Sequence, residues 1–550
     1  MPLLRLGPAL RYVGETEATI WVETDGPCEV EILGRKARTW HVEGHHYALV
    51  YIEGLEPGTT TPYSVALDGD IVWPQATALF PRPVIRTPKA GERVKMLFGS
   101  CRVAAPHVPP YSLGKDEDER GRGIDALYAF ARRMVEQKPE EWPHVLVWLG
   151  DQVYADEVSP ATEEFIEQNR DKRNPEAPDD QVANFEEYTH LYYESWTDET
   201  VRWMLSTVSS AMIFDDHDVH DDWNTSKDWV EEYRQKPWWN DRIVGGLMSY
   251  WIYQHIGNLS PRELEDDELY QSVCDADDAG EMLREFAYKA DREVGGARWS
   301  YCRQIGQSKL IVMDSRAGRV LEPGERQMVG DDEWDYIQKQ AEGDYNHLFL
   351  ATSLPYLLAP GMQHLEAWNE AVCDGAWGSQ WAKWGEKIRQ ELDLEHWGAF
   401  QRSFHRVREL VEEIGAGEKG SEPPASIVFL SGDVHHAYLS EVAFKRDRGV
   451  RSAVYQACCS PFRNPLDAKE RRAIKAMATR PARWLSGALA RAAGVRDPEM
   501  RWRFMKDPTF DNQVATLEWE GREALVRIEK AVPSDPAQPV LEEVFEHRIA

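Results

Sequence analysis

The chain has 550 residues, of which 42% are hydrophobic and 11% aromatic, with 22 tryptophans. This composition excludes a disordered protein, and the length exceeds one ordinary core, so we expect two domains, one of them large. The formal net charge of -31 makes general nucleic-acid binding improbable, because the phosphate backbone would be repelled.

The sequence predicts neither a membrane span nor an export signal. No apolar stretch has the length of a transmembrane helix, and the stretch MPLLRLGPALRYV is short and interrupted by Arg5 and Pro8. The seven cysteines show no zinc-finger or disulfide spacing, so we expect reduced thiols. We therefore expect a cytoplasmic protein, with a processed secreted form as the alternative. The oligomeric state is not predicted.

Residues 1–90 are expected to form an all-β sandwich domain. The short alternating runs ATIWVET, CEVEILG, YALVYIEG and YSVALDG are separated by turn signals, and GLEPGTTTPYSV is similar to fibronectin type III domains. The Pro-rich stretch PRPVIRTPKAGER is interpreted as a linker to a second domain over 91–550.

The second domain begins with a strand, helix, strand pattern. GIDALYAFARRMVEQ has the apolar spacing of a crossover helix. The acidic, aromatic insert 156–201 contains the predicted helix FEEYTHLYYESW. It is expected to lie near the pocket and to help select the substrate.

Four apolar runs end in side chains that bind metals. These are VKMLFGSCR, ending at Cys101; HVLVWLGDQVYADE, with Asp151; SAMIFDDHDVHDD, with the cluster 215–222; and SIVFLSGDVHHAYLSE, with Asp433, His435 and His436. Carboxylates brought together repel one another unless a cation lies between them. We therefore predict a polynuclear metal site at the ends of these strands.

The C-terminal third carries three further signals. WSYCRQIGQSKLIVMDSRAGR predicts a hairpin that ends at Asp314 and is followed by Arg316 and Arg319. The basic segment 466–494 predicts an amphipathic helix kinked at Pro481, either docked on its own domain or serving as a lid or membrane-surface helix; docking is preferred. The alternation over 512–531 predicts a hairpin turning at Glu520 and Gly521.

The motifs GSC, GDxxY, DDHD and GDVHH, in this order, resemble the PhoD-type alkaline phosphatases and phosphodiesterases of the calcineurin-like metallophosphoesterase superfamily. The resemblance implies an α/β fold, a four-layer α/β/β/α sandwich of two mixed sheets, preceded by the β domain. It also implies an Fe(3+) ion with Ca(2+) beside it.

The resemblance assigns roles to individual residues. Cys101, Tyr154 and His435 become iron ligands, Asp151 the bridging carboxylate and Asp433 a calcium ligand. Asp216 is a further metal ligand, and His217 lies near the leaving group. His436 is expected to face away from the metals. A hard trivalent ion can hold a phenolate at neutral pH and lowers the pKa of a bound thiol.

One departure concerns the second metal. Family members commonly carry two asparagines where this chain has Asp221 and Asp222. Asp221 would then be a carboxylate ligand in place of an amide. The added negative charge favours a divalent cation, so Zn, Mn or Mg at the second site stays open beside Ca(2+).

The predicted function is metal-dependent hydrolysis of a small phosphomonoester or phosphodiester, by attack of a metal-bound hydroxide on phosphorus. Arg316 or Arg319 would clamp a phosphate oxygen, or else pair with Asp314 or another acid, and His217 would protonate the leaving group. The alternatives are a phosphodiesterase acting on phospholipids or polymers at a membrane surface, a non-catalytic metal-containing binding protein, and an iron oxidase.

Overall fold

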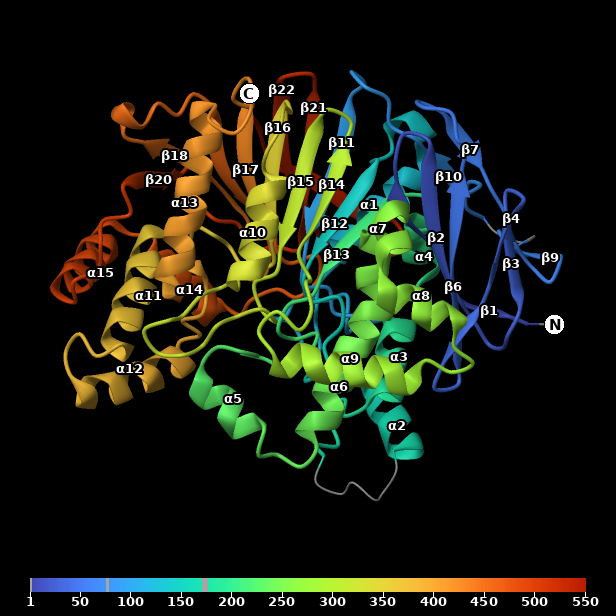
Figure 1. Ribbon diagram of the computed structural model, residues 1–550, viewed down its shortest axis with the longest axis horizontal. Coiled ribbons are helices and arrows are strands. Elements are labelled where there is room, and N and C mark those ends of the chain that lie inside the picture. Colours follow the sequence, from blue (N-terminus) through green and yellow to red (C-terminus); the bar gives the residue numbers. More distant parts are fainter. Residues whose placement is uncertain (1, 76–78, 171–176) are drawn as a thin grey trace.

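The computed structural model describes residues 2–75, 79–170 and 177–550. An N-terminal β domain (blue in Figure 1) lies on the opposite side of the molecule from the helices α12 and α15 (orange and red). Between them stand two large sheets. The predicted fold class, a mixed α/β protein with an N-terminal all-β domain, is confirmed.

The β domain consists of two four-stranded antiparallel sheets and a small strand pair. The sheet orders are β1-β2-β6-β5 and β4-β3-β8-β9, and β10 pairs with β7. The strands are β1 Leu4–Val13, β2 Glu17–Thr24, β3 Glu29–Ile32, β4 Arg35–Arg38, β5 Trp40–Val42, β6 His45–Glu53, β7 Thr60–Pro62, β8 Val65–Leu67, β9 Asp70–Trp73 and β10 Val84–Arg86.

One sheet of this domain is buried on both faces. In β2, Ile20 and Val22 face the core of the sandwich, whereas Trp21 packs into the main core of the second domain. Successive side chains of a strand point to opposite faces, so the run TIWV supplies two cores at once. The fibronectin III-like detail and the boundary near residue 90 stay predictions.

The second domain is built on two mixed sheets. The six-stranded sheet has the order β13-β12-β11-β21-β22-β23 and the seven-stranded sheet the order β14-β15-β16-β17-β19-β18-β20. The strands are β11 Val94–Gly99, β12 Val145–Leu149, β13 Ser209–Ile213, β14 Tyr301–Ile305, β15 Ser308–Met313, β16 His347–Thr352, β17 Ser426–Ser431, β18 Tyr438–Phe444, β19 Ala453–Cys458, β20 Met500–Phe504, β21 Gln513–Glu520, β22 Glu523–Val532 and β23 Val540–Arg548.

The two sheets share one core and have helices outside them. In β16, Phe349 and Ala351 point into the core shared with the six-stranded sheet, while Leu348 and Leu350 point to a second core under the outer helices α10 and α13. β11, β12 and β13 are parallel neighbours, as are β15, β16, β17 and β19. These strands are predominantly apolar, as expected of strands that are buried on both faces.

The helices are α1 Ala126–Glu136, α2 Pro160–Asn169, α3 Phe185–Trp196, α4 Glu199–Leu205, α5 Lys227–Tyr233, α6 Trp239–Ser249, α7 Pro261–Asp266, α8 Glu268–Asp275, α9 Gly280–Arg292, α10 Asp331–Gln340, α11 Pro360–Cys373, α12 Ser379–Glu391, α13 Gln401–Ala416, α14 Ala468–Met477 and α15 Arg480–Ala492. α1 is the predicted crossover helix, and α3 covers FEEYTHLYYESW. The insert 156–201 supplies α2, α3 and α4, and its residues 171–176 lie outside the described residues.

The basic segment forms two helices instead of one kinked helix. Thr479 caps the N-terminus of α15, which places Pro481 in the first turn of a new helix, where its missing N–H is not needed. α15 packs on α11 through Leu489 and Ala490, as the docking alternative requires. Trp484 and Leu485 on the same helix are 69% and 56% exposed, so they do not take part in this docking. Within the described residues, no helix combines the length and the apolarity that crossing a membrane requires.

Candidate metal centre

The four predicted strand ends converge between the two sheets. β11, β12 and β13 bring Cys101, Asp151 and the segment from Asp215 to one edge, and β17 of the other sheet delivers Asp433 and His435. Three overlapping groups each have ligand atoms within 4.8 Å of one another: Cys101, Asp151 and His435; Asp151, Asp216 and His217; and Asp215, Asp216 and Asp433. We call these residues together the metal centre.

The backbone of the metal centre is strained. Cys101, Asp151, Asp433 and His435 all have positive φ, between 47° and 65°. Non-glycine residues adopt this left-handed conformation at a cost of about 1–3 kcal/mol each and keep it only where the surrounding structure enforces it. Four such residues around one point indicate a site built for a function.

Two glycines let the strand ends approach one another. A Cβ on Gly150 would lie 2.6 Å from Cβ of Asp215, and one on Gly432 would lie 2.1 Å from Oγ of Ser100. Ser100 Oγ accepts a hydrogen bond from the amide of Asp433 at 2.9 Å, which ties β11 of one sheet to β17 of the other. Gly150 and Gly432, which precede Asp151 and Asp433, are therefore required because a larger side chain would clash with the neighbouring strand end.

Cys101 is a buried thiol surrounded by acids. The hydroxyl of Ser460 donates to its sulfur at 3.1 Å, and Oγ of Ser100 lies 3.0 Å from it. Burial, and then the charges of Asp151 and Asp433, raise the pKa of the thiol well above its ordinary value. The thiolate form therefore needs a cation beside it.

Tyr154 lies where the GDxxY motif predicts. Its hydroxyl is 3.5 Å from Oδ2 of Asp151 and accepts a hydrogen bond from Nδ2 of Asn464 at 3.2 Å. Burial, followed by the charges of Asp151 and Cys101, raises the pKa of the phenol well above its ordinary value.

The aspartates of the metal centre carry oxygen atoms without partners. Oδ1 of Asp151, Oδ2 of Asp215 and Oδ1 of Asp216 are buried and accept no hydrogen bond from the described residues. Burial is the largest cause that raises the pKa of each of these carboxyls, and neighbouring carboxylates add to it. Buried unpaired carboxylates are costly, so the arrangement calls for positive charge.

The two histidines of GDVHH differ in role. Burial lowers the pKa of His435 to about 4, which leaves the neutral imidazole that metals bind. His436 is turned away, as predicted, and stacks between the rings of Tyr438 and Phe510.

His217 is held by a carboxylate that the sequence analysis did not single out. Its Nδ1 lies 2.9 Å from Oδ1 of Asp156, and its ring packs against Tyr154. Burial alone would lower the pKa of His217, but Asp156, Asp216 and Asp151 raise it well above the ordinary value. Asp221 lies at the rim: its side chain is 64% exposed, and Oδ1 is 3.7 Å from Nε2 of His217.

Arg316 lies inside the metal centre and is fully buried. It bonds Asp215 through Nε and Glu395 through Nη1, and its Nη2 is 3.2 Å from Oδ1 of Asp216 without forming a hydrogen bond. Arg319 uses all three nitrogens within the protein, on the carbonyls of Ser315, Asn224 and Glu395. Of these two arginines, Arg316 is the one with a nitrogen that faces the aspartates without a hydrogen bond among the described residues.

The sequence analysis also missed His396. Its Nε2 is 3.3 Å from Oδ2 of Asp433, and its Nδ1 is 2.8 Å from Oε1 of the buried Glu366. His396 and Glu395 come from the loop between α12 and α13, and no apolar strand precedes them. The adjacent acid and imidazole in LEHWG were the available signal.

The donor set fits a metal pair. A thiol, a phenol, two imidazoles and several carboxylates surround the unpartnered aspartate oxygens. Thiolate and phenolate donors suit iron, and carboxylate oxygens suit a hard divalent cation. The structure therefore contains candidate groups of metal ligands, and the predicted roles of the single residues and the identity of the metals stay predictions.

Residues 122–276 match the family model described as PhoD-like phosphatase. The chain carries a PhoD-like phosphatase domain. This confirms the resemblance drawn from the motifs and the enzyme class, a phosphoester hydrolase. Residues 1–85 match a domain of unknown function, DUF7800, and no curated protein sequence matches the chain.

The chain is also similar to solved structures. A structure of PhoD, 11% identical, aligns over 99% of this chain and 90% of its own with a TM-score of 0.58. The purple acid phosphatase PPD1 from yellow lupin (Lupinus luteus) seeds is 10% identical over 100% of this chain and 74% of its own, with a TM-score of 0.48. At this identity, the likeness to PhoD supports the fold.

Proposed function

We propose that the chain hydrolyses phosphate esters at the metal centre. The observation that carries this proposal is the set of buried aspartate oxygens without partners, facing Cys101, His435 and the free Nη2 of Arg316. A cluster of this kind is costly unless cations occupy it, and cations at the carboxyl ends of strands can bind the phosphate of a substrate.

We assign one metal, Fe(3+), to Cys101, Tyr154 and His435, with Asp151 as the bridge. The second, Ca(2+) or another divalent ion such as Zn, Mn or Mg, is assigned to Asp216 and Asp433. The family resemblance and the chemistry of the donors support this division. Asp221 is proposed as a ligand only through water, because its side chain is largely exposed. When bound, such ions supply positive charge for the phosphate oxygens and lower the pKa of water enough to make it a nucleophile.

The protein groups have separate tasks in this proposal. Arg316 presents Nη2 toward the aspartates, where it can donate to a phosphate oxygen. His217 carries a proton on Nε2 toward the leaving oxygen, and Asp156 holds its Nδ1. Arg319 positions Glu395, which in turn holds Arg316.

The proposed substrates are small phosphomonoesters or phosphodiesters. Hydrolysis of p-nitrophenyl phosphate and of its bis-ester by the metal-loaded protein ranks these two classes. We expect turnover with at least one of them. Turnover with neither would contradict the proposed function.

Asp151→Asn tests the metal centre itself. We expect it to lower turnover by about a hundredfold or more, because the bridging charge is lost, while the fold is retained. Asp116→Asn, an exposed aspartate paired with Arg471, is the matched control and should behave as wild type. Wild-type rates in Asp151→Asn would rule out this site.

Elemental analysis and the visible spectrum test the iron assignment. We expect iron, together with a visible charge-transfer band that is lost or shifted in Tyr154→Phe. A colourless protein that contains zinc or manganese would remove the roles of Cys101 and Tyr154 as iron ligands and leave the hydrolase proposal standing.

A further inference from the structure

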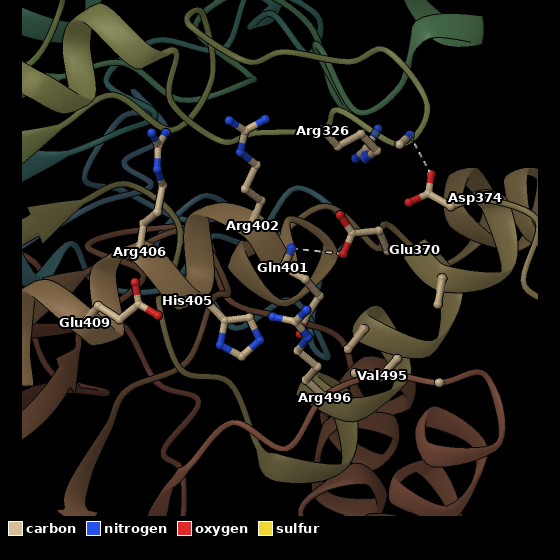
Figure 2. A pocket seen from close by; sticks show the side chains of 14 residues that line it. Arg326, Glu370, Asp374, Gln401, Arg402, His405, Arg406, Glu409, Val495 and Arg496 are labelled. Carbon is tan, nitrogen blue, oxygen red and sulfur yellow. Dashed lines mark hydrogen bonds between the residues drawn. The ribbon is translucent and has the colours of Figure 1, made fainter. Parts of the chain in front are cut away.

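A second pocket lies outside the metal centre, between helices α11 and α13, the loop before α10 and the segment that follows α15 (Figure 2). Its volume is about 440 Å³, which is enough for a small organic phosphate. None of the metal-centre residues lines it. We call it the arginine pocket, after Arg326, Arg402, Arg406 and Arg496 in its wall.

Arg326 is the buried charge of the arginine pocket. It is only 3% exposed, and its Nε and Nη1 have no hydrogen-bond partner among the described residues. Its Nη2 donates to the carbonyl of Thr225 at 3.2 Å, and its guanidinium stacks 4.2 Å from the ring centre of Phe400. These contacts fix the plane of the guanidinium and leave Nε and Nη1 without acceptors among the described residues. Burying an arginine in this way costs free energy unless an anion accepts hydrogen bonds from it.

The acids of the arginine pocket do not accept hydrogen bonds from Arg326. Asp374 accepts a hydrogen bond from the amide of Gly324 at 3.0 Å, and Glu370 accepts one from the amide of Gln401 at 2.9 Å, both drawn in Figure 2. Burial raises the pKa of Glu370 to about 8, so this carboxyl is largely protonated at neutral pH. Glu370 therefore adds little negative charge and can donate a proton to an oxyanion.

Further cations stand at the rim. Arg402 and Arg406 extend from α13 in the same direction (Figure 2), and Arg402 and Arg496 are exposed. Arg406 is already engaged by Gln327 and Asp331. A ligand entering the pocket therefore meets Arg402 and Arg496 first and Arg326 at its base.

We propose that the arginine pocket binds a phosphate group, either free orthophosphate or the terminal phosphate of a phosphomonoester. Nε and Nη1 of Arg326 lack acceptors among the described residues and can donate to the oxygens of an oxyanion, and the four arginines of the wall outnumber its three acids, Glu370, Asp374 and Glu409.

Calorimetric titration of the metal-loaded protein with orthophosphate tests the proposal. We expect two phosphate sites in the wild type, one at the metal centre and one in the arginine pocket. Arg326→Met, which keeps the volume and removes the charge, is expected to lose one of them. Equal numbers of sites in the two proteins would overturn the proposal.

Two further variants test whether the change in Arg326→Met is specific to the arginine pocket. Arg496→Gln changes an exposed wall residue without disturbing the interior, and it should weaken the second site by about tenfold. Arg503→Gln, an exposed arginine on β20 that pairs with Glu441, should leave both sites unchanged. If both single variants, Arg496→Gln and Arg326→Met, kept the second phosphate site unchanged, phosphate would bind outside the arginine pocket.

The source of the phosphate is distinguished by a second titration. Glucose 6-phosphate added to Asp151→Asn, which is expected to hydrolyse it poorly, should compete with orthophosphate for the arginine pocket if a phosphomonoester is the ligand. Orthophosphate binding without such competition would restrict the site to the free anion. This proposal rests on the proposed function only for the site at the metal centre: absence of turnover in the wild type would contradict that function, whereas loss of a phosphate site in Arg326→Met would still report on the arginine pocket.

Discussion

His45 is a single side chain that joins the N-terminal β domain to the second domain. Its Nδ1 lies 3.0 Å from Oε1 of Glu23 within the β domain, and its Nε2 lies 2.8 Å from Oε2 of Glu186 on α3. Burial alone would lower its pKa, but the hydrogen bonds that His45 donates to Glu186 and Glu23 raise it to about 9. His45 is thus a cation between two carboxylates at neutral pH.

The raised pKa of His45 makes stability depend on pH. A group whose pKa is higher in the folded state contributes fully below its unfolded pKa and loses that contribution as the pH rises through the folded value. We expect the free energy of unfolding to fall by up to about 3 kcal/mol between about pH 6.5 and about pH 9 because of this group. Urea unfolding of wild type and His45→Gln measures it.

The control for this prediction is the neighbouring His46→Gln. Burial lowers the pKa of His46, so this histidine cannot make stability fall as the pH rises, and His46→Gln should keep the fall seen in the wild type. A slope of equal size in His45→Gln and wild type would contradict the role of His45.

At the residue scale, the sequence predicted the strand-end part of the metal centre. Cys101, Asp151 and Asp433 each follow an apolar run, and a buried strand forces its last polar residue to the edge of the sheet. Glu395 and His396 follow no strand, so no periodicity marked them. The burial of Arg316 depends on Asp215 and Glu395, which are distant in sequence, and a local pattern cannot show such pairing.

Strand β21 comes from the C-terminal end of the sequence but lies inside the six-stranded sheet. It pairs antiparallel with β11, so a strand from the last tenth of the sequence lies directly beside the strand that ends at Cys101. Leu517 of β21 is fully buried in the core between the sheets. Packing of β21 therefore supports the strand that carries the cysteine.

We expect Leu517→Ala to lower the free energy of unfolding by about 2–5 kcal/mol, because a buried leucine leaves a cavity. Chemical denaturation measures the change. Leu485→Ala, on the exposed face of α15, is the matched control and should cost less than about 0.5 kcal/mol. Similar losses in both variants would show that β21 is not part of the cooperative core.

At the element scale, the local pattern predicted hairpins and helices but not their neighbours. The helix over FEEYTHLYYESW lies where the sequence placed it. The predicted hairpin is present, but it turns at Gly521 and Arg522, because Glu520 still pairs with Glu523. The partner of the hairpin, β11, was not predicted, because a strand buried on both faces carries no mark of what lies beside it. Pro481 was interpreted as a kink within one helix. Thr479, two residues earlier, is a residue type that caps helix N-termini, and together the two residues indicate the start of a new helix.

On the scale of the whole molecule, the two domains share a buried interface. Arg11 of β1 is fully buried and donates to the carbonyls of Tyr253 and Gln254, both at 2.7 Å, in the π-helical turn after α6. Trp21 packs beside Trp196 and Tyr253 at the same interface. The β domain was predicted from alternation as a separate module, but alternation does not distinguish a solvent-facing side from a second core.

We expect Arg11→Ala to destabilise the protein by about 3 kcal/mol, because two buried carbonyls lose a charged donor. Differential scanning calorimetry should show one transition in the wild type and a lower or divided transition in the variant. Arg35→Ala removes an exposed arginine that pairs with Glu53, and it should leave the melting temperature within error. A wild-type profile for Arg11→Ala would mean that the interface contributes little.

The pairing of β11 with β21 also orders events during synthesis. β11 leaves the ribosome roughly 400 residues before its partner, which at translation rates of about 5–20 residues per second is a delay of roughly 20–80 s. During that time one edge of β11 has no neighbour, and nascent chains on the same messenger can pair through it. Translation speed and holdase chaperones should therefore affect the yield of this protein more than that of proteins whose central strands are close together in sequence.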